Sequence, residues 1–282
     1  MTVRIGSVWD STQQVLAGRA GMLAPFAAIG FVLPTVVQLL LMHGMGAVAW
    51  GSVAAMLLSL VLGIWAQLAI MALATHPATT SGDAARAGRD RFLPVLGVAI
   101  VLGFVLGLAL LVPVIVLAST DYDFAALVAA NGNPALMPAI PGRVLAFLTF
   151  YLLAFGVIAI WLGVRLMLTY AVALNERCGL GAYRRSFALT RGLTWRLIGV
   201  SLLFLIVISV AGLAVQGVAG AALRLILGPD RPGILLGLVG LSGAIVNAGF
   251  LTLAYVFVAR LYVATAGERH APVIAEDGTP SL

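Results

Sequence analysis

Long apolar stretches alternate with short polar segments along this chain of 282 residues. Six of the stretches contain the roughly 20 apolar residues that an α-helix needs to cross the hydrocarbon core of a bilayer. We expect spans at residues 22–42, 46–75, 92–118, 144–174, 197–227 and 233–265. Backbone groups find no water in lipid, so these stretches must be helical there. The pattern predicts an all-α integral membrane protein with six transmembrane helices.

Shorter amphipathic segments precede the first, third and fifth spans, at residues 5–19, 81–91 and 179–191. In each, apolar positions recur at helical spacing opposite polar ones. The second, fourth and sixth spans also end alike, with Gln67, Arg165 or Arg260 followed by Leu. The pattern predicts three parallel repeats of a cytoplasmic amphipathic helix followed by a transmembrane hairpin. Such repeats are known in transporters, but duplication builds other helix bundles too.

The spans occupy most of the chain, so we expect a single membrane domain at residues 1–265. Residues 266–282 are polar and contain Pro and Gly, which is typical of a short flexible tail. The long segment 119–142 is interpreted as a connector that rests on headgroups, with a lid over the bundle as the alternative.

The charges agree with a membrane topology better than with a nucleic-acid surface. Only 9% of the residues are charged, and all 16 basic residues are arginine. Most lie before the first, third and fifth spans or after the sixth. Because basic residues are enriched in cytoplasmic loops, we expect both termini in the cytoplasm. In a bacterium this places the chain in the inner membrane, and we expect no nucleic-acid partner.

No residue pattern indicates catalysis or metal binding. The sequence has no His-Glu-x-x-His motif and no phosphate-binding Gly-x-x-x-x-Gly-Lys motif, and Cys178 is the single cysteine. His43, His76 and His270 are predicted at membrane edges or in the tail, where they do not converge. We therefore expect no catalytic residue, metal or cofactor, and an intramembrane enzyme is the least favoured interpretation.

A few polar residues interrupt the apolar stretches. The four amides are Gln38, Gln67, Gln216 and Asn247. Polar groups at this depth usually face the interior of a bundle, where they form interhelical hydrogen bonds or line a polar cavity. Arg165 and Arg260 are expected near the inner edge of the hydrocarbon. The favoured interpretation is that both reach lipid phosphates, and the alternative is a buried structural or functional role.

The segment 165–203 carries a recognisable phrase, in which a Glu and a Gly precede a Ser-x-x-Leu-Thr-x-Gly-x-x-Trp-Arg entry into the next helix. Its residues here are Glu176, Gly181, Ser186, Leu189, Thr190, Gly192, Trp195 and Arg196. This phrase resembles bacterial six-helix membrane proteins of the glycerophosphoryl diester phosphodiesterase membrane-domain family and its stand-alone uncharacterised relatives. The resemblance implies an α-helical bundle. The phosphodiesterase barrel of that family has no counterpart in this chain, so the resemblance implies no enzymatic activity.

The leading hypothesis is a non-enzymatic membrane protein that interacts with anionic lipids or with membrane partners. Arginines near a bilayer attract anionic headgroups, by about 1 kcal/mol each. The candidate headgroup contacts are Arg184, Arg185, Arg191, Trp195 and Arg196. The alternative is a transporter or permease component with a polar cavity lined by the four amides.

Overall fold

All regular secondary structure in the described parts of the chain is helical. The structure is a computed structural model that describes residues 4–44, 49–120, 122–130, 133, 136–176, 178–228 and 232–267. Among these residues, six helical stretches are long and apolar enough to cross a membrane. The predicted class of six-span, all-α membrane protein is confirmed. The predicted tail lies almost wholly outside the described residues.

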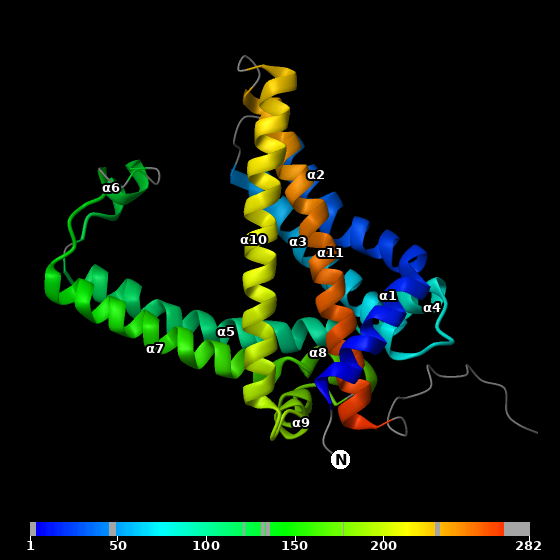
Figure 1. Cartoon of the computed structure of the whole chain (residues 1–282). Coiled ribbons are helices and arrows are strands. Elements are labelled where there is room, and N and C mark those ends of the chain that lie inside the picture. Colours follow the sequence, from blue (N-terminus) through cyan, green and yellow to red (C-terminus); the bar gives the residue numbers. More distant parts are fainter. Residues whose placement is uncertain are drawn as a thin grey trace, which may run out of the picture. The chain divides into compact units, whose positions relative to one another are not determined.

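Most helices agree with the predicted spans and amphipathic segments (Figure 1). In chain order they are α1 (Ile5–Ala27), the π-helical turn η1 (Ala28–Val32), α2 (Leu33–Gly44), α3 (Ala49–Thr75), α4 (Ser81–Asp90), α5 (Phe92–Ala118), α6 (Phe124–Ala129), α7 (Gly142–Leu166), α8 (Thr169–Glu176), α9 (Gly181–Leu189), α10 (Thr194–Leu227) and α11 (Pro232–Ala266).

The contacts between residues divide the chain into two compact units. Unit 1 comprises Met1–Leu96 and Val164–Leu282, and unit 2 comprises Gly97–Gly163. Unit 2 therefore holds most of α5 and α7 together with α6. Each unit is described by itself below. The expectation of a single domain at residues 1–265 stays a prediction.

A tyrosine compensates for a proline in unit 2. Pro113 lies inside α5 and has no backbone N–H, so it cannot bond the carbonyl of Ala109 four residues earlier. The hydroxyl of Tyr151 on α7 donates a hydrogen bond of 2.7 Å to that carbonyl. The ring of Tyr151 stacks between Phe147 and Phe155 on the same helix. The freed carbonyl is thus satisfied inside an apolar hairpin, where no water is at hand.

The first predicted amphipathic segment is not a separate helix. Residues 5–19 form the start of α1, which continues through η1 into α2. The reason is tertiary packing, since α1 contacts α3 and α11 and buries Val8 and Thr12 completely or nearly so. The other two amphipathic segments form separate helices, α4 and α9.

The π-helical turn in the first span lies just before Pro34. Leu33 donates its N–H to the carbonyl of Ala28, five residues back. Such turns are often associated with tight packing or function. Gly30, which is buried within the turn, packs directly against Ala66 of α3. The turn therefore brings the backbone of the first span close to α3 at a position where only Gly fits.

The fourth candidate span, Gly142–Glu176, agrees with the stretch predicted at residues 144–174, but its helix is broken near the end. α7 ends at Leu166 and α8 begins at Thr169. The helix break leaves the carbonyl of Arg165 available, and it accepts hydrogen bonds from Ser186 Oγ of α9 (2.8 Å) and from Thr190 Oγ1 just after α9 (3.3 Å). No Pro or Gly marks this break in the sequence, because its partners lie about 20 residues further along the chain.

The core of unit 1 forms around three sequence segments with similar endings. The second half of α3, all of α8 and the second half of α11 contact one another. The most buried residues there include Leu68, Ile70, Leu168, Val172, Leu261 and Tyr262. These segments follow Gln67, Arg165 and Arg260, so the predicted repeat has a structural counterpart.

The amphipathic helices α4 and α9 dock in a related way. Trp65 Nε1 of α3 donates to the carbonyl of Ala85 in α4 over 3.2 Å. A guanidinium nitrogen of Arg165 donates to the carbonyl of Phe187 in α9, also over 3.2 Å. In both cases the preceding span supplies a side-chain donor to the backbone of the helix that follows it. The donors differ in type and lie at different positions relative to the shared Gln67-Leu and Arg165-Leu endings, so the three repeats stay a prediction.

Candidate functional site

The candidate site is built on α9, a short helix that contacts α8 and α11. Its buried face consists of Ala182, Ser186 and Thr190, which recur every four residues. Ser186 and Thr190 belong to the phrase recognised in the sequence, and both bond the end of α7. Their hydroxyls fix which face of α9 points inward. The arginines of α9 therefore lie on its remaining faces.

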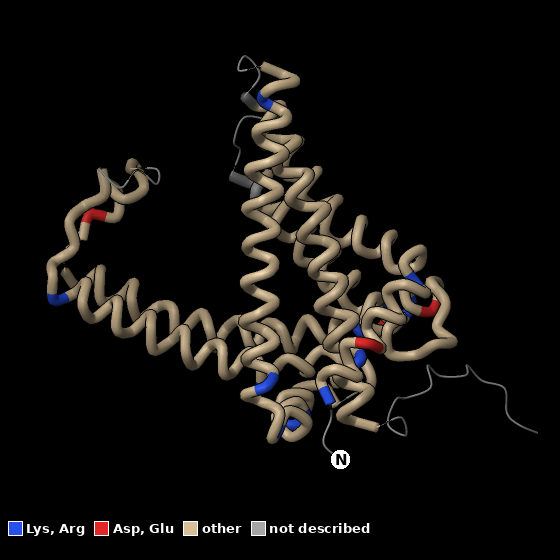
Figure 2. Tube along the Cα trace, viewed as in Figure 1, with Lys and Arg blue, Asp and Glu red and all other residues tan. Residues whose placement is uncertain are grey.

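Four of the five predicted headgroup contacts are exposed. Arg184 on α9, Arg191 in the turn after it, and Trp195 and Arg196 at the start of α10 are all exposed, and Trp195 reaches 84%. In the described part of the chain, the side chains of Arg184, Arg191 and Arg196 form no hydrogen bond or ion pair. Figure 2 shows basic positions gathered where α9 meets the start of α10. Within unit 1, α10 carries its other arginine, Arg224, in its last turn.

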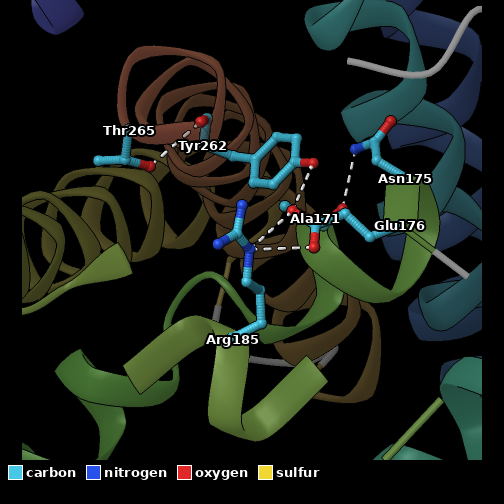
Figure 3. A network of polar contacts seen from close by, with 6 residues as sticks. All are labelled: Ala171, Asn175, Glu176, Arg185, Tyr262 and Thr265. Atoms are coloured by element: carbon cyan, nitrogen blue, oxygen red, sulfur yellow. Dashed lines mark hydrogen bonds and ion pairs between the residues drawn. The ribbon is translucent and has the colours of Figure 1, made fainter. Parts of the chain in front are cut away.

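Arg185, the fifth predicted contact, is in a different environment. Its Nε donates to both carboxylate oxygens of Glu176, at 3.2 Å to Oε1 and 3.0 Å to Oε2. The hydroxyl of Tyr262 donates to the same Oε1 over 3.1 Å. Figure 3 shows Arg185 from α9 and Tyr262 from α11 both directed at Glu176, the last residue of α8. The network therefore joins the ends of three helices.

Partial burial strengthens this network. Tyr262 is fully buried, and the side chain of Glu176 is only 19% exposed, whereas that of Arg185 is 37% exposed. A hydrogen bond between ionised groups is stronger than one between neutral groups. Salt screens a partly buried ion pair less than an exposed one. The carboxylate of Glu176 thus holds one end of the Arg185 guanidinium against the protein while the other end remains accessible.

Cys178 lies two residues beyond Glu176 and is exposed. Desolvation of the thiol raises its pKa, and the negative charge of Glu176 raises it further. The thiol is therefore protonated at neutral pH, which disfavours a role as nucleophile.

The four intramembrane amides are not alike in the structure. Gln38, Gln216 and Asn247 are exposed, and Gln67 is half-buried. Three of them therefore lie on exposed helix faces of this chain, and the interior placement of the four amides stays a prediction. The reason is that α2, α10 and the first part of α11 bury few of their residues.

Arg165 and Arg260 donate hydrogen bonds to protein groups. Arg165 donates to the carbonyl of Phe187 and lies over its ring, with Cζ 5.1 Å from the ring centroid. Arg260 donates to Ser11 Oγ over 3.2 Å and to the carbonyl of Ala74 over 3.4 Å. Both side chains are half-buried. The structure thus favours the structural role that the sequence left as the alternative.

Arg19 is a structural residue that the sequence analysis did not identify. One of its terminal nitrogens donates to the carbonyls of Leu73 (2.7 Å) and His76 (2.9 Å). Together with Arg260, it supplies cationic donors to carbonyls at the end of α3, which the helix itself leaves unpaired. Its position just before the predicted first span was visible, but its partners 54 and 57 residues away were not.

Glu176 and Tyr262 were also missed as site residues. Glu176 was noted as part of the recognised phrase, and it lies two residues beyond a predicted span. That position was the available signal. Nothing in the sequence indicated that Tyr262, 86 residues later, would meet it.

Among the described residues, no group of three or more His, Cys, Asp or Glu side chains comes together. The expectation of no metal stays a prediction. A scan of protein-family models, a search of curated proteins and a search of solved structures each found no match. The resemblance carried by residues 165–203 therefore also stays a prediction. The fold and the site show a multi-pass helical membrane protein.

Proposed function

We propose that the protein is a non-enzymatic inner-membrane protein that binds anionic lipids through its basic surface. This surface consists of Arg184, Arg191, Trp195 and Arg196. The observation that carries the proposal is the exposure of these four residues, three of them cationic, at one junction between helices.

The position of the basic surface relative to the spans supports a headgroup ligand. Gly142–Glu176 and Thr194–Leu227 are candidate spans, and α9 lies between them in the sequence. The basic surface therefore flanks the polar ends of two apolar segments. Trp is enriched at the level of the headgroups, where its ring is apolar and its N–H is polar. Trp195 is well placed for that role.

Electrostatic attraction determines how much the arginines of the basic surface contribute to lipid binding. An arginine near an anionic bilayer contributes about 1 kcal/mol. Replacement of two of them is therefore expected to weaken binding by about 2 kcal/mol, which corresponds to about 30-fold. The contribution is screened within a Debye length of about 8 Å at physiological salt, so high salt should remove most of it. In this proposal the basic surface and both termini face the cytoplasm, as the positive-inside rule favours.

The proposal is tested with the full chain extracted in mild detergent from membranes that contain phosphatidylglycerol. Native mass spectrometry measures the retained lipid by class. The test variant carries Arg184→Gln and Arg191→Gln. The matched control carries Arg143→Gln and Arg224→Gln, two exposed arginines predicted on the opposite side of the membrane.

We expect the test variant to lose retained phosphatidylglycerol and the control to keep it. Equal loss in both variants would refute the proposal, because it would show that total charge and not the basic surface determines binding. Retention of a polar solute in place of lipid would support the transporter alternative. The exposure of three of the four amides gives that alternative no support at present.

A further inference from the structure

The ion pair between Glu176 and Arg185 leaves donors and acceptors unused. Arg185 contacts Glu176 through Nε alone, and its two terminal nitrogens form no hydrogen bond in the described part of the chain. Figure 3 draws the dashed lines of Arg185 from Nε and none from these two terminal nitrogens. They carry four N–H groups in a planar fork, a geometry that matches two oxygens of a phosphate.

Glu176 also has acceptor capacity to spare. Among the described residues, its Oε2 accepts from Arg185 alone, whereas Oε1 accepts from both Arg185 and Tyr262. An ionised carboxylate has about four lone-pair positions. The side chain is 19% exposed, so it is not fully closed to a ligand that reaches Arg185. The pair therefore offers one cationic fork and one anionic acceptor next to each other.

The charge of the pair selects the ligand class. A purely anionic headgroup bound at the fork would bring a second negative charge close to Glu176, and like charges in a partly buried site repel. A zwitterion avoids this cost, because its phosphate meets the arginine and its ammonium meets the carboxylate. Complementary charges of this kind contribute more to specificity than to raw affinity.

The place of the pair in the chain indicates a lipid as the source of the zwitterion. Glu176 is the last residue of a candidate span, and Arg185 lies before the next span, which begins at Thr194. Both are therefore expected at the level of the headgroups. We propose that Glu176 and Arg185 form a site for a phosphoethanolamine lipid, with the phosphate on the terminal nitrogens of Arg185 and the primary ammonium on Glu176. Tyr262 is a positioning residue, since it holds the carboxylate.

This inference is separate from the anionic-lipid proposal, because it concerns the one arginine of α9 that has an acidic partner. It also makes a sharper chemical distinction. A primary ammonium donates hydrogen bonds to a carboxylate, whereas a trimethylated ammonium has no N–H to donate. The site should therefore prefer phosphatidylethanolamine to phosphatidylcholine with the same acyl chains.

The experiment reconstitutes the full chain in vesicles with equal amounts of phosphatidylethanolamine, phosphatidylcholine and phosphatidylglycerol. After mild extraction, native mass spectrometry measures the lipids retained. The wild type is expected to retain about ten times more phosphatidylethanolamine than phosphatidylcholine. This ratio corresponds to the free energy of one charge-assisted hydrogen bond. Vesicles with mono- and dimethylated phosphatidylethanolamine should give a stepwise decline. This series uses the wild type alone, so it does not depend on the folding of any variant.

Two variants assign the preference to residues. Glu176→Gln keeps a side chain that can accept from Arg185 and Tyr262 but removes the charge, so the preference for phosphatidylethanolamine over the other two lipids should disappear. Arg89→Gln is the control, because Arg89 is exposed on α4 and belongs to neither proposed site. A free solute, O-phosphoethanolamine, is added in a further arm and should not displace the lipid.

Three results would overturn the inference. They are equal retention of phosphatidylethanolamine and phosphatidylcholine by the wild type, an unchanged preference in the Glu176→Gln variant, and displacement of the lipid by free O-phosphoethanolamine. The last result would assign the same chemistry to a solute. Loss of phosphatidylglycerol in the Arg184→Gln and Arg191→Gln variant is a different readout, so failure of one proposal does not imply failure of the other.

Discussion

The hydrogen bond from Tyr151 to Ala109 gives a direct test of how this chain accommodates a proline inside a transmembrane helix. Tyr151→Phe removes the hydroxyl that donates to the Ala109 carbonyl over 2.7 Å. The ring stays, so its stacking with Phe147 and Phe155, at centroid distances of 6.0 and 6.4 Å, should persist. The change therefore isolates one hydrogen bond.

The expected cost follows from the loss of the Tyr151 hydroxyl as a donor to that carbonyl. Interhelical hydrogen bonds in membranes contribute about 0.6 kcal/mol on average and up to about 1.7. An unsatisfied buried carbonyl costs about 1–3 kcal/mol. Because Pro113 cannot replace the lost donor, we expect Tyr151→Phe to lower the free energy of unfolding by about 1–2 kcal/mol.

A double-mutant cycle identifies the cause. Pro113→Ala restores a backbone N–H that bonds the Ala109 carbonyl within α5, so Tyr151→Phe should cost less than about 0.5 kcal/mol in that background. The assay is equilibrium unfolding of the purified chain in mixed micelles with increasing dodecyl sulfate, followed by far-ultraviolet circular dichroism. An equal cost of Tyr151→Phe in both backgrounds would refute the reasoning, because it would show that the hydroxyl does not serve the carbonyl that Pro113 leaves unpaired.

Two further predictions concern unit 1. Gly30→Ala places a methyl group in direct collision with Ala66, so it should lower the free energy of unfolding by about 1–3 kcal/mol in the same assay, whereas Gly18→Ala, with open space around it, should be neutral or slightly stabilising. Because desolvation and Glu176 raise the pKa of the Cys178 thiol, its maleimide labelling should reach half-maximal rate at higher pH in the folded than in the unfolded chain. The Glu176→Gln variant should move that midpoint to lower pH, and an unmoved midpoint would contradict the proximity of the two groups.

The fold class and the positions of the spans could be predicted from the sequence because they depend on residues that are neighbours in the chain. A helix in lipid satisfies its own backbone, so length and apolarity suffice to find it. The same holds for α4, whose start at Thr80 and Asp83 is a capping box of adjacent residues. Arg184, Arg191, Trp195 and Arg196 are exposed, and their role as headgroup contacts stays a prediction.

The remaining features depend on partners that are distant in the sequence. The break after Leu166 requires hydroxyls from α9, and the continuity of α1 requires packing against α3 and α11. A predicted surface contact, Arg185, proved to be half of an ion pair because α8 brings Glu176 to it.

By itself, the sequence determined that the chain spans a membrane as helices and where the charges between spans lie, since hydrophobic periodicity and charge are properties of neighbouring residues. Only the tertiary structure decided which polar groups are used within the protein. Arg19, Arg165 and Arg260 could reach either lipid phosphates or protein carbonyls, and which of these lies within hydrogen-bonding distance depends on how the helices pack. Hydrogen bonds act over about 3 Å, and the sequence does not specify distances of that size between separate helices.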